Sequence, residues 1–207
     1  MTITLNATTG ISTPPVSVLG DTSGSITFAA PAVAGTNTQT LVAVTGTLAP
    51  LIAGTAVAST SGTSIDFTSI PSWVKRITVM FSGVSTNGSS NLQCQIGTSG
   101  GIQTSSYISV VTTVFSGTSV ATAITTGFGL CANMGATVTN QGSFRISLID
   151  SSTGIWACDG TLARGDSAAN YVIAGAKTLS GTLDRVRITT VNGTDTFDAG
   201  TINILYE

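Results

Sequence analysis

The chain has 207 residues, of which 42% are hydrophobic and 8% are charged, whereas an ordinary globular domain is about one quarter charged. This hydrophobic content and a formal net charge of −2 exclude a disordered chain, and the charge excludes strong electrostatic attraction to nucleic acid or anionic membranes. The sequence contains no histidine, the commonest general base and metal ligand, so we expect no enzymatic activity, no cofactor and no metal.

The first 62 residues are predicted to form a small extended segment for attachment and trimerisation. Asp21 is the only charged side chain before residue 66, and most apolar side chains there are small. Residues 26–49 hold two short apolar runs around a turn, but a lone hairpin of this kind is marginally stable in water. We therefore expect these residues to be buried at the axis of a homotrimer or against a partner. Pro50 and the Gly and Ser residues that follow it mark the domain boundary.

Signals for export or membrane insertion are not found in the sequence. The N-terminal MTITLNATTG lacks the basic and apolar regions of a secretory signal peptide, and no apolar stretch approaches the roughly 20 residues that span a bilayer. We therefore expect assembly in a cytoplasm without membrane insertion. The three cysteines lack CxxC spacing and are expected to be reduced, buried thiols: Cys94, Cys131 and Cys158.

Residues 63–207 are predicted to form an antiparallel, jelly-roll-like β-sandwich. Helical periodicity is almost absent, and short β-branched runs alternate with Gly, Asn, Ser and Asp turns. Residues 75–81 and 143–149 alternate apolar and polar side chains, which predicts one buried face for each strand. Asn87-Gly88 is the strongest hairpin signal. Further strands are predicted at residues 92–96, 106–114, 121–126, 128–132, 155–158, 171–174, 185–191 and 201–206.

Long stretches of this second region resemble a known family. Residues 65–81, IDFTSIPSWVKRITVMF, and the following SGVSTNGSSNLQCQIGTSGGIQTSSY resemble the C-terminal domain of tail-fibre proteins from tailed bacteriophages. The ending VNGTDTFDAGTINILYE is similar to the close of that domain, so the resemblance covers about residues 60–207. Upstream, ITFAAPAVAGTNTQTLVAVTGTL resembles a shorter segment found in many phage fibres.

The resemblance implies a homotrimeric virion fibre that adheres to the host cell surface without catalysis. Its N-terminal segment would join other tail or baseplate proteins, and its distal domain would bind a host glycan or protein. The chain differs from long phage fibres, which have a repetitive shaft, because it has almost no shaft. One alternative is therefore a structural capsid or baseplate protein, such as a decoration or head fibre, that binds no receptor. A polysaccharide hydrolase would need two carboxylates converging in one cleft, and the acidic residues here are few.

Candidate ligand-binding residues gather in one short stretch, where an aromatic side chain and three charges lie close together. Sugars stack a C–H face on an aromatic ring while polar side chains hydrogen-bond their hydroxyls. We expect a recognition loop at residues 159–169, where Asp159, Arg164 and Asp166 bond sugar hydroxyls. Trp156 would supply the stacking face, and packing of Trp156 in the core is the alternative.

Three other patterns are interpreted as structural features. Trp73 is expected to pack at an end of the sandwich. The RGD tripeptide at residues 164–166 is interpreted as an ordinary exposed loop. Asp195 and Asp198 beside Asn192 lack the spacing of an EF-hand calcium loop, so a hairpin turn is expected there.

Overall fold

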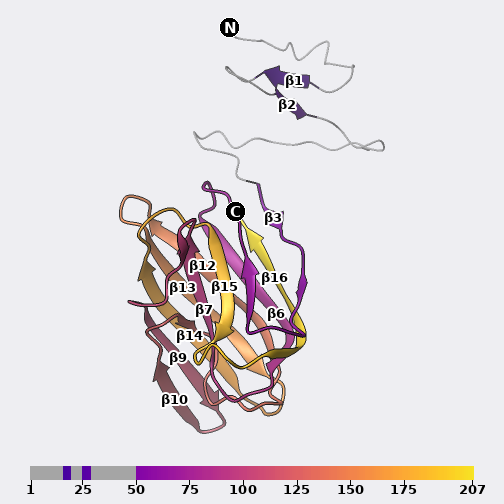
Figure 1. Ribbon diagram of the computed structural model, residues 1–207, viewed down its shortest axis with the longest axis vertical. Helices are drawn as coiled ribbons and strands as arrows, with labels where there is room; N and C mark the ends of the chain where they lie inside the picture. Colours follow the sequence, from indigo (N-terminus) through magenta and orange to yellow (C-terminus); the bar gives the residue numbers. More distant parts are fainter. Residues whose placement is uncertain (1–15, 20–24, 29–49) are drawn as a thin grey trace. The chain divides into compact units, whose positions relative to one another are not determined.

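The computed structural model describes residues 16–19, 25–28 and 50–207 of the chain (Figure 1). These described residues contain no helix, and every strand pair among them is antiparallel. The prediction of an all-β, antiparallel protein is therefore confirmed. The all-β fold class follows from local preferences, because β-branched residues favour extended backbone, and Gly, Asn and Asp favour the turns between strands.

The chain divides into two units, Met1–Thr47 and Leu48–Glu207. In the first unit, β1 (Val16–Leu19) and β2 (Ser25–Phe28) form an antiparallel pair. The rest of that unit, and with it most of the predicted attachment segment, lies outside the described residues. The second unit begins upstream of residue 63, because two short strands before that position pair with the C-terminal strand.

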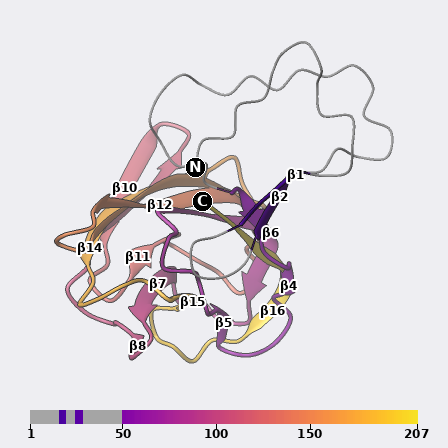
Figure 2. The ribbon, with the colours of Figure 1, turned by 90° about the horizontal axis from the view of Figure 1, so that it is seen from above.

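Two sheets of the second unit lie face to face, an arrangement consistent with a β-sandwich (Figures 1 and 2). The larger sheet contains β3 (Ile52–Ala53), β4 (Val57–Ala58), β6 (Arg76–Thr86), β9 (Ile108–Phe115), β10 (Thr118–Ala123), β12 (Asn140–Asp150), β13 (Ile155–Arg164), β14 (Asn170–Thr178) and β16 (Phe197–Tyr206). The smaller sheet contains β5 (Ser64–Phe67), β7 (Leu92–Thr98), β8 (Gly101–Ile102), β11 (Phe128–Gly129) and β15 (Arg185–Thr190).

Strands distant in sequence are neighbours in both sheets. The larger sheet runs in the order β10-β9-β14-β13-β12-β6-β16-β3, with β4 also pairing with β16. The smaller sheet runs β11-β7-β15-β5, with β8 also pairing with β7. The chain therefore crosses repeatedly between the two layers, and the core forms only when both sheets are in place.

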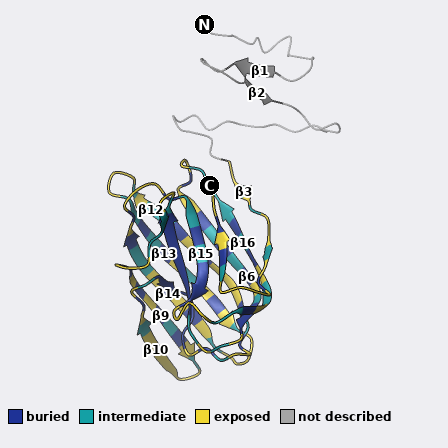
Figure 3. Ribbon diagram, in the orientation of Figure 1, coloured by how far each residue is buried: buried dark blue, intermediate teal, exposed yellow. Residues whose placement is uncertain are grey.

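The core lies between the two sheets (Figure 3). Buried and more exposed residues alternate along strands such as β9 and β14, whereas β7 is buried almost throughout. Ile77 and Val79 of β6 face inward and stand opposite Ile146 and Phe144 of β12, as the alternating patterns predicted. The cysteines are free and buried, and burial raises the pKa of their thiols. The largest fully buried side chains are Tyr171, Phe128, Phe144, Phe197, Ile77, Leu92, Ile96, Leu130, Ile146, Leu162, Ile173 and Ile188.

The Asn87-Gly88 signal does not produce the predicted hairpin, because β6 and β7 belong to different sheets. Instead, the backbone N–H of Asn87 donates to the carbonyl of Thr196 at 2.9 Å, and the N–H of Thr196 donates to Asn87 Oδ1 at 2.9 Å. Asn192 shapes the β15–β16 turn by accepting the N–H of Thr194 at 3.0 Å. This turn also joins different sheets. Turn residues therefore reversed the chain as expected, but they did not decide which sheet the next strand joined.

The predicted recognition loop at residues 159–169 is mostly strand. β13 continues to Arg164 because it pairs on both sides, with β12 from Asn140 and with β14 from Asn170. Only residues 165–169 connect β13 to β14. Polar side chains at alternate positions of β13 are compatible with a strand that has one exposed face, which local composition does not distinguish from a loop.

Candidate functional site

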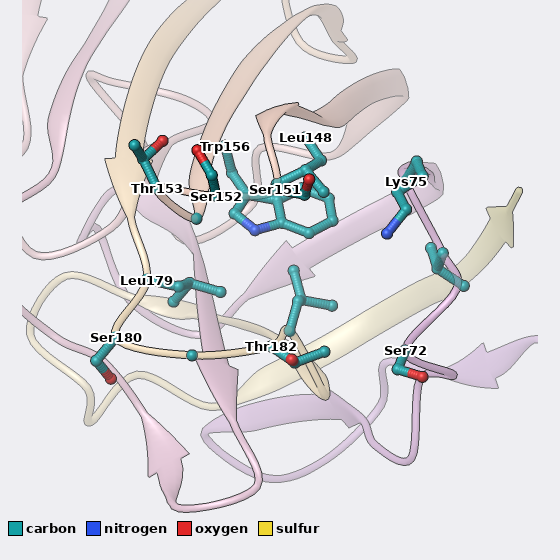
Figure 4. A pocket seen from close by; sticks show the side chains of 14 residues that line it. Ser72, Lys75, Leu148, Ser151, Ser152, Thr153, Trp156, Leu179, Ser180 and Thr182 are labelled. Carbon is teal, nitrogen blue, oxygen red and sulfur yellow. The ribbon is translucent and has the colours of Figure 1, made fainter.

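A pocket of about 360 Å³ lies at one end of the larger sheet (Figure 4). Three segments border it: residues 72–75 before β6, residues 151–154 between β12 and β13, and residues 179–183 between β14 and β15. Pockets for small molecules are about 300–1,000 Å³, so this one suits a ligand of about one or two sugar rings. We call it the end pocket.

The β12–β13 turn that forms one wall is organised by Asp150. Its Oδ1 accepts hydrogen bonds from the backbone N–H of Ser152 at 2.8 Å and from the Ser152 hydroxyl at 2.7 Å. Its Oδ2 accepts the hydroxyl of Thr153 at 3.0 Å. These hydrogen bonds, with those from Ser152 the strongest, hold the pKa of Asp150 below its ordinary value. The turn closes where Gly154, at φ +69°, donates its N–H to the Asp150 carbonyl at 2.9 Å.

Backbone hydrogen bonds tie the three walls together. The N–H of Leu148 donates to the carbonyl of Lys75 at 2.8 Å, and the N–H of Leu179 donates to the carbonyl of Gly154 at 3.0 Å. Beside this end, the ring of Trp73 lies 5.9 Å from that of Tyr206, measured between centroids. The walls therefore belong to one hydrogen-bonded framework, which favours a preformed pocket over an induced one.

Trp156 forms part of the pocket floor. It occupies an inward position of β13, opposite Leu148 of β12 and Lys177 of β14, and only 3% of it is exposed. Figure 4 shows the indole lying across the pocket with its nitrogen directed toward the cavity. No described residue forms a hydrogen bond with that nitrogen. Trp156 therefore packs in the core on one side and borders the pocket on the other.

Hydroxyl groups dominate the rest of the lining. Lys75 is the only charged side chain among the described lining residues, and none of them is Asp or Glu. The hydroxyl groups and Lys75 can hydrogen-bond a polar ligand, whereas Trp156, at 3% exposed, offers almost no accessible surface for stacking. The hydroxyl side chains are those of Ser72, Ser151, Ser152, Thr153, Ser180 and Thr182.

The charged residues proposed from sequence do not join Trp156. Asp159 lies on the exposed face of β13, where its Oδ2 accepts a hydrogen bond from Nη2 of Arg145 at 2.6 Å. Arg164 lies at the far end of the same strand, roughly 25 Å from Trp156 at the usual rise per residue. The structure therefore separates the four candidates into three places, with Trp156 alone at the end pocket.

Arg164 and Asp166 form a local clamp at that far end. Nε and Nη2 of Arg164 donate to the two carboxylate oxygens of Asp166 at 2.8 Å each, and Nη1 donates to the carbonyl of Asn133 at 2.8 Å. The guanidinium also lies 5.9 Å from the centroid of the Phe115 ring. Its hydrogen bonds lower the pKa of Asp166 to about 2. With its donors engaged and its side chain 10% exposed, Arg164 supports loop structure more than ligand contact.

Sequence reasoning missed the residues that surround Trp156 in the pocket. The signals are visible afterwards as the Ser/Thr-rich stretches at residues 150–154 and 179–183. Neither stretch contains an aromatic residue or a charge cluster beyond Asp150, and more than 20 residues separate them. Only the pairing of β12, β13 and β14 brings them to the same end of one sheet.

The part of the chain that the structure describes holds no group of three or more His, Cys, Asp or Glu side chains suited to a metal ion. It holds no helix long and apolar enough to cross a membrane. A second, shallow hollow of about 490 Å³ lies over β12, β13 and β14, beside the Arg145–Asp159 ion pair.

Comparison of the chain with protein-family models, with curated proteins and with solved structures gave no match. Its function is therefore inferred from the fold, the end pocket and the sequence resemblance.

Proposed function

We propose that this is a structural protein of a bacteriophage virion, a tail fibre that adheres to the host cell surface by non-covalent binding. The observation that carries the proposal is the end pocket, which Trp156, Lys75 and six hydroxyl-bearing residues line from three hydrogen-bonded walls. A concave site lined by several hydroxyl groups and one ammonium group can hydrogen-bond the many hydroxyls of a sugar. A host surface glycan is therefore the ligand favoured over a protein.

The pocket lining supports the proposal of binding without catalysis. Hydrolysis of a glycosidic bond needs a carboxylic acid and a second carboxylate on either side of that bond. The carboxyl of Asp150, next to one wall of the pocket, is held within its own turn by Ser152 and Thr153. The protein would thus hold a glycan and release it intact.

A homotrimer is part of the proposal, and the outer face of the larger sheet supports it. This face, turned away from the smaller sheet, exposes Ile108, Val110 and Val114 on β9 and Val172 on β14. Its central charges, Arg145 and Asp159, neutralise each other, so copies of the chain would meet there without repulsion. Three linked sites would convert weak glycan contacts into firm attachment. Contacts by the N-terminal segment, with copies or with other virion proteins, belong to the proposal and lie mostly outside the described residues.

The jelly-roll likeness also belongs to the proposal. It is supported by β6 pairing with β16 and by β7 pairing with β15, because Greek-key arrangements need such long-range antiparallel neighbours.

The outer face of the larger sheet, whose central charges neutralise each other, also favours a second candidate function. This is a capsid or baseplate protein that packs on its neighbours and binds no receptor. The two functions differ in whether the end pocket takes a glycan.

Binding of the purified full chain to an array of bacterial surface glycans tests the proposal. Thr182→Trp should fill the end pocket and abolish binding, whereas Thr194→Trp, in the exposed β15–β16 turn, should leave binding unchanged. Circular dichroism should show that both variants are folded. Equal binding by Thr182→Trp and the unaltered chain would remove the pocket from the function. No glycan binding by the unaltered chain would favour the capsid or baseplate role.

A further inference from the structure

Lys75 stands out among the cations of the described residues. Each arginine is paired with a carboxylate: Arg76 with Glu207, Arg145 with Asp159, Arg164 with Asp166, Arg185 with Asp184 and Arg187 with Asp66. Lys177 donates to the carbonyl of Ser105 at 2.9 Å and lies over the ring of Tyr107. Lys75 has no ion pair with any described carboxylate, and it lines the end pocket.

The side chain of Lys75 is directed into the cavity. Figure 4 shows its ammonium group reaching toward the indole of Trp156 from the opposite wall. The backbone of Lys75 is fixed on both sides, because its N–H donates to the carbonyl of Glu207 at 2.7 Å and its carbonyl accepts the N–H of Leu148. The backbone of Lys75 is therefore held in place, while its flexible side chain can adjust to a ligand.

Nearby carboxylates are engaged elsewhere. Asp150 accepts its hydrogen bonds from Ser152 and Thr153, Asp184 is paired with Arg185 at 2.8 Å, and the side chain of Glu207 is paired with Arg76. The lining thus offers one positive charge, an indole N–H and several hydroxyl donors, with no negative charge. A concave site with charge of one sign concentrates ligands of the opposite sign.

We infer that the end pocket binds an acidic saccharide, whose carboxylate or phosphate group accepts hydrogen bonds from the Lys75 ammonium. The sugar hydroxyls would be bonded by the side chains of Ser72, Ser151 and Thr182, because the hydroxyls of Ser152 and Thr153 already donate to Asp150. This inference rests on the glycan binding proposed above and adds the charge of the ligand. A charge-assisted hydrogen bond is roughly twice as strong as a neutral one, so the anionic group should dominate selectivity.

Titration calorimetry with paired probes tests the inference on the full chain. The carboxylate arm compares galacturonate and glucuronate oligosaccharides with their neutral methyl esters. The phosphate arm compares glucose 6-phosphate with glucose. We expect at least one acidic probe to bind about tenfold more tightly than its neutral partner, with the difference falling as salt is raised.

Substitutions assign the effect to Lys75. Lys75→Met should remove the preference for the acidic probe, and Lys75→Arg should retain most of it. Arg187→Met, which makes the same change in net charge on the smaller sheet, should leave the preference intact. Acid-selective binding that survives both Lys75→Met and Thr182→Trp would place the anion elsewhere and overturn the inference.

The two proposals fail in different ways. Equal binding of acidic and neutral probes, lost in Thr182→Trp, would overturn the acidic preference and leave glycan binding in place. Absence of binding by every probe and by the glycan array would overturn both.

Discussion

The indole of Trp156 belongs to the sandwich core and to the end pocket at once. Substitutions of different size should separate these roles. Trp156→Ala should cost about 3–5 kcal/mol of stability, because a large buried side chain leaves a cavity. Trp156→Phe should keep the fold while weakening glycan binding several-fold, because the indole N–H at the pocket is lost. Urea unfolding and calorimetry measure the two effects. Unchanged glycan affinity in the Phe variant would separate Trp156 from binding.

Asp166 should give the fold a measurable dependence on acid pH. Hydrogen bonds from Arg164 lower the pKa of this carboxyl to about 2 in the folded protein, against about 3.9 in an unfolded chain. A carboxyl with a lowered folded pKa stabilises the fold above the unfolded value, and this contribution disappears as pH falls from about 4 to about 2.

The prediction is checked with Asp166→Asn, which keeps the shape of the side chain and removes the titrating group. Urea midpoints should favour the unaltered protein at pH 7, and the difference should vanish near pH 2. Glycan binding should be the same in both proteins, because the clamp lies at the far end of β13 from the pocket. A lower glycan affinity in Asp166→Asn would restore the recognition role that the sequence suggested for this residue.

At the scale of elements, the pairing of β6 with β16 depends on an irregular stretch. The register shifts near Gly200, whose φ is +93°, and a Cβ there would lie 2.5 Å from the backbone of Gly83. Gly193 also has a positive φ, +70°, but a Cβ there would meet nothing within 4 Å. A Cβ at Gly193 would therefore cause backbone strain alone, whereas a Cβ at Gly200 would also collide with backbone atoms of Gly83.

Alanine substitutions at these glycines should differ in cost. Gly193→Ala should lower the free energy of unfolding by about 1–2 kcal/mol, the cost of left-handed backbone for a residue with a Cβ. Gly200→Ala should cost clearly more, because backbone atoms of β6 must also move. Urea unfolding of both variants gives the comparison. Equal costs would mean that the β6–β16 register can shift to admit a methyl group.

At the scale of the whole molecule, the proposed trimer should depend on the outer face. Val110 and Val191 have nearly equal exposure, 41% and 42%, but Val110 lies on the outer face and Val191 follows β15. Val110→Glu should weaken trimer association about tenfold or more, because an unpaired carboxylate would be buried at the contact between copies. Val191→Glu should leave it unchanged. Sedimentation of the full chain over a range of concentrations measures both.

A clean monomer of the unaltered chain at micromolar concentration would contradict the trimer itself. A trimer that tolerates Val110→Glu as well as Val191→Glu would instead move the contact between copies away from the outer face. The first outcome would also favour single-site binding over multivalent attachment.

The amino-acid sequence determined the fold class and the faces of individual strands. Alternation at residues 75–81 and 143–149 correctly placed Ile77 and Phe144 inside, because successive side chains of a strand point to opposite faces. The missing histidine and the scarcity of acidic residues also limited the chemistry that any site could perform. These are local or compositional properties, and they do not depend on which strands become neighbours.

Tertiary structure alone decided the composition of the candidate site. Trp156 and Arg164 are close in sequence, but an extended strand carries them to opposite ends of the sandwich. Lys75 and Thr182 are distant in sequence, but the order β14-β13-β12-β6 brings their segments to one pocket. Strand pairing is chosen by the joint burial of many side chains from both sheets, so no single segment of the sequence encodes it.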